Sequence, residues 1–295
     1  MPNTGFYPPA KVQPKLRDYI SNPTEIRRDL DELINRATIA DYAFAQGPAN
    51  NGAVVYDEVT GLVEGEREAE AIAPGAEFPL LDGAAVTPQT AKVQKYGGAD
   101  HMTWESINFN EWDTMQRKLR ILRQKVIRKV NKVSVDALVA NQNVRTFGVG
   151  TAWGESGADP VGDIMRAAAV VEADEDFTYQ ANLALVNPLD KQDFLLSRDI
   201  RDQFPRESRE LNPALSGDID GIAGLEWITS SSVPQGTIYA FERGVVGSVR
   251  DSGGGLQVNT FTDNDRQREV VQAWRHIVPI ITDPLAAVKI TGFRN

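Results

Sequence analysis

The chain has 295 residues, of which 41% are hydrophobic and 24% charged, and its 41 acidic against 31 basic residues give a formal net charge of −10. This composition is that of a globular protein with a sizeable core, and the excess of acid argues against a surface that binds duplex DNA everywhere. The lack of cysteine excludes disulfides and thiolate chemistry, no apolar run reaches the ~18 residues of a membrane-spanning helix, and the N-terminus lacks the apolar centre of a signal peptide.

The chain opens with an arm, residues 1–22, that is predicted to have little regular structure. Proline fixes φ and removes a backbone donor, and this arm contains Pro2, Pro8, Pro9 and Pro14. The following stretch, TEIRRDLDELINRAT, predicts a helix with Thr24 as its N-cap. Its apolar stripe at helical spacing comprises Ile26, Leu30, Leu33, Ile34 and Ala37.

Residues 46–100 are predicted to form a long two-stranded arm with an acidic tip. AVVYDEV and QTAKVQKY are predicted to be its strands. The connection between them is longer than ~15 residues, which is uncommon for a loop inside a compact domain. The acids of this connection are Glu64, Glu66, Glu68, Glu70, Glu77 and Asp82, against the lone Arg67.

A long basic helix is predicted next, with Asn110 as its N-cap. Apolar residues then recur every three or four positions: Trp112, Met115, Leu119, Leu122, Val126, Val130 and Val133. About 30 residues at ~1.5 Å each give a helix ~45 Å long. Its other positions carry bases without an acid from Met115 to Val133, namely Arg117, Lys118, Arg120, Arg123, Lys125, Arg128, Lys129 and Lys132.

Beyond Gly157 the pattern predicts a compact α/β unit. DPVGDIMRAAAVVEAD and PLDKQDFLLSRD are predicted helices, and NLALV between them is a buried strand. GLEWITSSSVPQGTIYAFERGVVGSV supplies short strands, VNTFTDNDRQREVVQAWRHIVPIIT mixes strand with a region of undecided type, and LAAVKITG closes the chain as a strand.

No catalytic, cofactor-binding or metal-ligating residue is predicted, and the chain is not expected to be an enzyme. His101 and His276 are too far apart in sequence to suggest a local metal site. GVGTAWGESG does not follow a buried strand, as a dinucleotide-binding loop must, and GDIDG lacks the later ligands of a calcium loop. No cofactor is expected.

The basic helix has several readings. A DNA reader is expected within a basic domain, and a membrane-surface helix should be an independent element with one bulky apolar face. The remaining readings are a solvated face on a core-packing helix, or a surface that contacts acids of other copies or an enclosed polyanion. A single copy has little reason to order a proline-rich arm and a long acidic connection, so assembly with identical copies is favoured.

Three C-terminal segments carry a resemblance to a known family. The family's step from a strand through Asn-Pro to a helix is resembled by LALVNPLDKQDFLLSRD. Its pair of strands joined by a small polar turn is resembled by GIAGLEWITSSSVPQGTIYAFERG. Its final long strand, followed by the closing strand, is resembled by DNDRQREVVQAWRHIVPIITDPLAAVKITG. Together with the order of elements, they resemble the major capsid proteins of tailed bacteriophages with the Hong Kong 97-type fold.

The resemblance implies an α+β fold in four parts. These are an N-terminal arm and short helix (1–45), an extended β-hairpin loop (46–100), a peripheral domain with the long spine helix (101–156 and 262–295) and an α/β axial domain (157–261). Two features depart from the family. Many members begin with a scaffolding segment, for which this chain is expected to have no room. Some members form a Lys–Asn cross-link, which is not carried over because Lys92 and Lys95 lie at the base of the hairpin instead of its tip.

The implied partners are further copies, as pentamers and hexamers of a closed shell in the virion, and non-specifically bound packaged double-stranded DNA. A portal and separate scaffolding and decoration proteins are also implied, with assembly in the host cytoplasm and no membrane. The expected contacts between copies join Glu64, Glu66, Arg67, Glu68, Glu70 and Glu77 to Arg117, Arg120, Arg123, Arg128, Lys129 and Lys132. The alternatives are an encapsulin-type nanocompartment and a soluble α+β enzyme or carbohydrate-binding protein.

Overall fold

The computed structural model describes residues 15–34, 38–49, 52–62, 71–75, 78, 84–173, 178–197, 200, 219 and 221–294. Its helices are α1 (Leu16–Ile20), α2 (Pro23–Ile34), α3 (Ile39–Ala43), α4 (Trp104–Asn108), α5 (Trp112–Ala140), α6 (Pro160–Glu172) and α7 (Pro188–Leu196), with 3₁₀ turns η1 (Ile222–Gly224), η2 (Asn264–Arg266) and η3 (Pro284–Ala286). Its strands are β1 (Ala45–Pro48), β2 (Ala53–Leu62), β3 (Ala84–Lys92), β4 (Gln94–Thr103), β5 (Arg145–Gly148), β6 (Leu183–Val186), β7 (Glu226–Thr229), β8 (Thr237–Phe241), β9 (Gly247–Asp251), β10 (Gln257–Asp263), β11 (Arg268–Ile281) and β12 (Ala287–Thr291).

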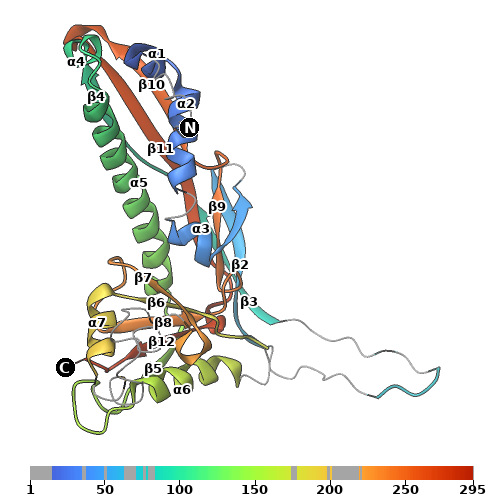
Figure 1. The fold of residues 1–295 in the computed structure, drawn as a ribbon. Coiled ribbons are helices and arrows are strands. Elements are labelled where there is room, and N and C mark those ends of the chain that lie inside the picture. The colour runs from blue at the N-terminus through green and yellow to red at the C-terminus, as the bar shows by residue number, and fades with distance from the viewer. Residues whose placement is uncertain are drawn as a thin grey trace, which may run out of the picture. The chain divides into compact units, whose positions relative to one another are not determined.

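These elements confirm the predicted α+β class (Figure 1). By internal packing the chain divides into two compact units, residues 1–36, 96–127 and 256–275 as unit 1, and 37–95, 128–255 and 276–295 as unit 2. The four parts implied by the resemblance are a different division of the chain, and their boundaries stay a prediction.

Unit 1 is built on an antiparallel hairpin in which β10 pairs with the first part of β11. The helix α2 packs on β10, and the strand β4 pairs with β11. The close approach of β4 requires a glycine, because a Cβ on Gly97 would lie 2.4 Å from Trp274 Cβ and 2.5 Å from the Ala273 oxygen. Buried apolar side chains of this unit include Leu16, Ile20, Ile26, Leu30, Met115, Leu119 and Leu122.

Two predictions about the N-terminal elements were wrong. The stretch 16–20 is helical, because tertiary contacts hold it: the Leu16 amide donates to Asn110 Oδ1 at 3.0 Å, and the rings of Tyr19 and Trp112 lie 5.2 Å apart. The helix α2 begins at Pro23, so Thr24 lies inside it and is not its N-cap. Proline suits a first helical position, because its missing N–H has no intrahelical partner there. The four prolines on which the prediction of an arm was based lie outside the described residues.

The long helix α5 confirms the predicted basic helix, at 29 residues or ~44 Å. Its predicted stripe is buried at Met115, Leu119, Leu122, Val126 and Val130. Asn110 is not its N-cap. The residue has a left-handed backbone conformation with φ of 56°, and its side-chain oxygen accepts a hydrogen bond from the first amide of α1 instead.

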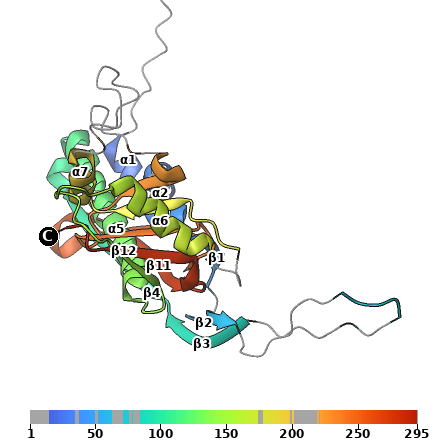
Figure 2. The same cartoon turned by 90° about the horizontal axis from the view of Figure 1, so that it is seen from below.

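Unit 2 contains a five-stranded sheet in the order β5-β12-β8-β6-β7 (Figure 1). The helix α6 packs against β12 and β8, and Figure 2 shows it beside β12. The predicted strand β6 is buried at all four positions, as a central strand must be when both faces are covered. Separately, β1 pairs in parallel with β9, and β9 pairs antiparallel with the last part of β11. The predicted helices α6 and α7 and the closing strand β12 are confirmed.

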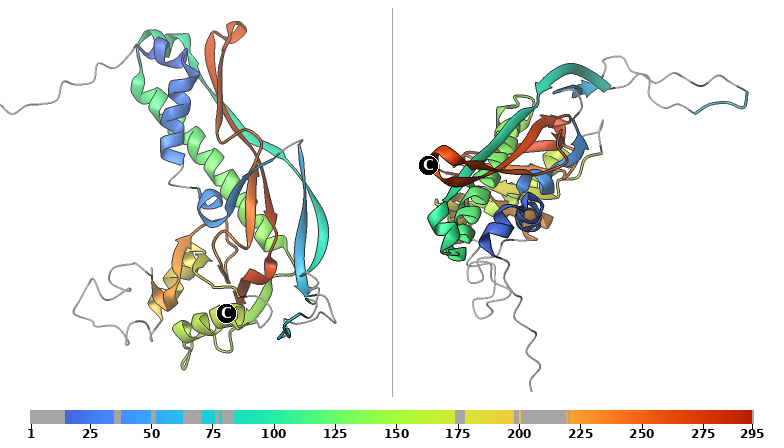
Figure 3. Two further views of the ribbon diagram at one scale, coloured as in Figure 1. Left: turned by 90° about the vertical axis from the view of Figure 1, so that its right-hand side faces the viewer. Right: turned by 90° about the horizontal axis from the view of Figure 1, so that it is seen from above.

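Unit 2 also carries the antiparallel hairpin of β2 and β3, a curved two-stranded ribbon with a register shift between Val59 and Gly61 (Figure 3). The predicted strand QTAKVQKY is in fact split, because β3 ends at Lys92 and β4 begins at Gln94. The acidic connection is only partly described. Its predicted contact residues Glu64, Glu66, Arg67, Glu68, Glu70 and Glu77 lie outside the described residues.

Candidate assembly surfaces

The basic face of α5 is exposed for most of its length. Of the predicted contact residues, Arg117, Arg120, Arg128, Lys129 and Lys132 are exposed and Arg123 is half-buried. Lys132 pairs with Asp136 of the same helix at 3.2 Å. Arg117, Arg120, Arg123 and Arg128 form no ion pair with another described residue. Within the described part of the chain, these four guanidinium groups therefore have no carboxylate partner.

Lys118 differs from these bases, because β4 of its own unit engages it. Its ammonium group lies 3.6 Å from Asp100 Oδ1 and donates to the His101 carbonyl. His101 thus takes part through its backbone oxygen. Among the described residues, no group of three or more His, Cys, Asp or Glu side chains is placed to hold a metal ion.

The middle of the hairpin is held by a buried carboxylate that local sequence patterns do not reveal. Glu58 of β2 is 6% exposed, and its Oε1 accepts from Asn141 Nδ2 at 2.7 Å and from Asn143 Nδ2 at 2.9 Å. Both amides lie directly after α5. The next residue of β2, Val59, donates its amide to the Thr282 oxygen at 2.8 Å. These contacts fix the middle of β2 to residues that follow α5 and β11.

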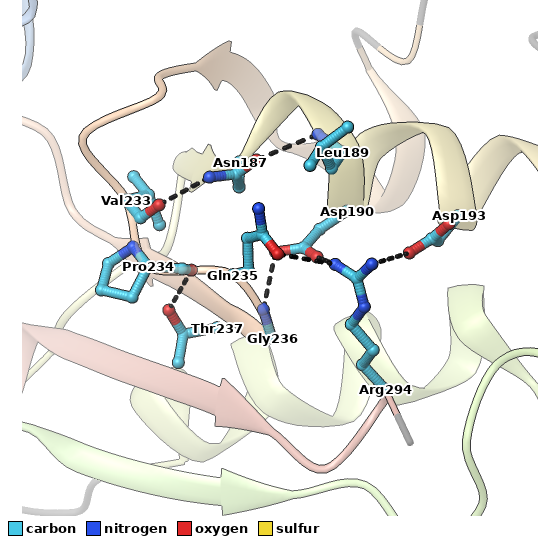
Figure 4. Close-up of polar contacts among 10 residues, drawn as sticks. All are labelled: Asn187, Leu189, Asp190, Asp193, Val233, Pro234, Gln235, Gly236, Thr237 and Arg294. Atoms are coloured by element: carbon cyan, nitrogen blue, oxygen red, sulfur yellow. Dashed lines mark hydrogen bonds and ion pairs between the residues drawn. The ribbon is translucent and has the colours of Figure 1, made fainter.

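A second buried carboxylate, Asp190 on α7, anchors the C-terminal end of the chain (Figure 4). Its Oδ1 accepts from Arg294 at 3.0 Å and its Oδ2 from the Gly236 amide at 2.9 Å. Arg294 also lies 3.7 Å from Asp193. Burial raises the pKa of Asp190, and the contacts with Gly236 and Arg294 oppose that rise without cancelling it.

Local sequence explains how α7 presents this carboxylate. Asn187 caps the helix, accepting from the Leu189 amide at 3.0 Å and donating to the Val233 oxygen at 2.8 Å, and Pro188 takes the first helical position. Beside it, Phe293 stacks on Trp153 with ring centroids 4.4 Å apart, which fixes the chain just before Arg294. The Asn-Pro step was predicted, but the ion pair 104 positions away was not.

Within the described part of the chain, no helix combines the length and apolar character needed to cross a bilayer. Two features of the described residues are candidates for contact with other copies: the arginines of α5 that have no described carboxylate partner, and the hairpin of β2 and β3. The order of elements, with a long helix and a five-stranded sheet on an α+β scaffold, is that of the shell-forming capsid proteins of the Hong Kong 97-type fold that the sequence resembles.

The comparisons identify the family. Residues 85–290 match the family described as phage capsid protein, so the chain belongs to that family and is a major capsid protein, a structural protein of the virion. A comparison with curated protein sequences finds no match.

Solved structures share the fold at low sequence identity. A structure described as Microbacterium phage Oxtober96 matches with a TM-score of 0.62 and 15% identity, covering 86% of this chain and 91% of the other. A virus-like particle from Pyrococcus furiosus matches with a TM-score of 0.60 and 10% identity, covering 90% and 97%. The holo-SrpI encapsulin complex from Synechococcus elongatus PCC 7942 matches with a TM-score of 0.58 and 13% identity, and the match covers 85% of each chain.

Proposed function

We propose that this capsid protein self-assembles, as pentamers and hexamers, into a closed icosahedral shell that encloses the double-stranded DNA genome of a tailed bacteriophage. Its family supports this function directly. The supporting observation in the structure is the hairpin of β2 and β3, of which one face is left without cover.

Register defines that face, because cross-strand partners point the same way. Val55 pairs with Thr90 and Val59 with Val86, so Val55 and Val86 share one face, and they are 72% and 49% exposed. An isolated two-stranded hairpin is marginally stable in water. A surface from a second copy would bury these β-branched side chains and stabilise the hairpin.

Charge supplies the second part of the proposal. The acids Glu64, Glu66, Glu68, Glu70 and Glu77 of one copy contact the bases of α5 in another, among them Arg117, Arg120, Arg123, Arg128, Lys129 and Lys132. Exposed ion pairs contribute only ~0–1 kcal/mol each, so their value lies in register and in summation over many copies. Bases that meet no acid are available for non-specific contact with packaged DNA.

Further partners follow from the same function. A portal closes one vertex of such a shell, and separate scaffolding and decoration proteins take part in its assembly. The mature protein then resides in the virion after assembly in the host cytoplasm.

Electron microscopy of the purified or co-expressed chain tests the proposal. Closed particles are expected, and a stable monomer under all assembly conditions, with and without a scaffolding protein, would overturn it. The encapsulin likeness supplies the second candidate, a nanocompartment with a protein cargo. Nuclease-resistant DNA inside particles formed during infection supports the capsid, whereas an enclosed protein cargo without DNA supports the nanocompartment.

A further inference from the structure

A groove in unit 1 lies between the N-terminal helices and the first half of α5. It has a volume of about 410 Å³, and its lining is Tyr19, Asp29, Leu30, Trp112, Met115, Gln116, Leu119, Arg120 and Arg123. Leu30, Met115 and Leu119 are buried and supply an apolar floor. Of the six bases predicted to contact other copies, this lining includes Arg120 and Arg123.

Two hydrogen-bond donors among the residues that line the groove lack an acceptor. The indole N–H of Trp112 and the Nε–H of Arg123 are both shielded from solvent and donate to no acceptor among the described residues. The guanidinium of Arg120 forms no ion pair with another described residue either. Buried donors are normally satisfied, because a donor without a partner loses its interaction with water and gains nothing in return.

A carboxylate is the group that satisfies such a set. It accepts hydrogen bonds at two oxygens, matches the planar fork of a guanidinium and neutralises its charge. The apolar floor requires a small hydrophobic neighbour beside the acid. Both needs are met by a short peptide in which acids alternate with apolar residues.

A nucleic acid fits the groove less well. Asp29 belongs to its lining, where it accepts from the Tyr19 hydroxyl at 2.9 Å. Its charge opposes any anion, but it opposes a phosphate chain, which carries one charge per nucleotide, more than a short segment with two glutamates. Tyr19 is 7% exposed and packed against Trp112, so its ring is not free to stack on a base. Burial and the bond to Asp29 both raise the pKa of Tyr19, which keeps its hydroxyl a donor.

We propose that this groove receives glutamate side chains from the acidic segment of a second copy of this chain. The sequence EAEAI, from Glu68 to Ile72, has the required alternation of acids with small apolar residues. This inference rests on the proposed shell function and sharpens it: Arg120 and Arg123, rather than the other bases of α5, carry the specific contact.

Charge reversal on one helix provides the test. Arg120→Glu with Arg123→Glu should lower the yield of closed particles at least about tenfold, the loss expected when a charge-assisted hydrogen bond is broken. The matched control, Lys125→Glu with Arg266→Glu, makes the same change in charge at two exposed bases that lie outside the groove and outside the proposed contact set, and it should stay within about twofold of the unaltered chain. Circular dichroism and thermal unfolding check that each subunit is folded. Equal particle yields from the two double variants would overturn the proposal.

Compensation tests the partner. Glu66→Lys, Glu68→Lys and Glu70→Lys should also impair assembly and leave the subunit folded, and combining this triple variant with the reversed groove should restore particles. Co-expression of the groove variant with the triple variant should yield more particles than either alone. Failure of the mixture to improve on either would place the contact within one chain and reject the second copy.

A peptide experiment separates this inference from the shell function. A synthetic peptide of residues 63–74 is titrated into the full-length, unassembled chain, with the change in Trp112 fluorescence as the signal and Trp112→Phe as the control. A peptide with Gln for every Glu should bind at least about tenfold more weakly. Binding of the acidic peptide by a chain that forms no particles would retain the groove and reject the shell. Particles without detectable preference for the acidic peptide would do the reverse.

Discussion

Replacing Glu58 by alanine tests whether the buried carboxylate holds the middle of the hairpin. The substitution removes the acceptor of two amide donors, Asn141 Nδ2 at 2.7 Å and Asn143 Nδ2 at 2.9 Å. Hydrogen bonds to a charged group contribute ~1.5–3 kcal/mol each. Asn143 is exposed, so water replaces much of its lost contact, whereas Asn141 is half-buried. We therefore expect Glu58→Ala to lower the free energy of unfolding by about 2–3 kcal/mol.

Two further variants locate the cause of that loss. Glu58→Gln keeps an oxygen acceptor and removes the charge, so the expected loss is about 1 kcal/mol. Asp57→Ala changes the exposed neighbouring residue on the same strand and should stay within ~0.5 kcal/mol of the unaltered chain.

Urea unfolding of the unassembled chain supplies the free energies, with the slope against urea checked for each variant. Because the chain has two compact units, unfolding need not be two-state, so hydrogen exchange of the β2 amides is measured alongside. Faster exchange confined to the hairpin is expected for Glu58→Ala. The reasoning is refuted when Glu58→Ala and Asp57→Ala give the same free energy and the same exchange.

Two more predictions concern packing and pH. Gly97→Ala should lower the free energy of unfolding by ~1–3 kcal/mol, measured by thermal unfolding, because the added Cβ would lie 2.4 Å from Trp274 Cβ. The control Gly148→Ala, with no atom within 4 Å of its added Cβ, should be nearly neutral. Equal effects of the two substitutions would contradict the close approach of β4 to β11. Burial raises the pKa of Asp190, so its contribution is complete below the unfolded-state pKa of about 4 and is lost as pH rises through the native value. The free energy of unfolding of the unaltered chain minus that of Asp190→Asn should therefore fall as pH rises, and a rise would show that the Arg294 pair outweighs burial.

Sequence alone was sufficient for elements whose signal is local. The stripe of α5 repeats every three or four residues, a period that only a helix places on one face, and its buried members Met115, Leu122 and Val130 follow that period. The all-apolar strand β6 and the Asn-Pro start of α7 were likewise predicted, because burial on both faces and helix capping each depend on a few adjacent residues. The exposed bases of α5 were predicted for the same reason.

Other features depended on partners that local patterns do not reveal. The helix α1 was not predicted, because its first amide is bound by the side chain of Asn110, 94 positions away. The same contact explains why Asn110 does not cap α5, as the sequence had predicted. The continuous 14-residue strand β11 is defined by pairing with β10 and β9 rather than by its own composition.

The sequence by itself determined the helix and strand periods, the location of charge and the resemblance to a capsid family. Only the tertiary structure decided which charges are buried and paired, as with Glu58 and Asn141 or Asp190 and Arg294, and which two arginines line a groove. The physical reason is separation along the chain, because side-chain periodicity acts over only a few residues. The two ion or hydrogen-bond pairs join groups 83 or more positions apart, and the groove lies between different helices, so only the packed fold brings these residues together.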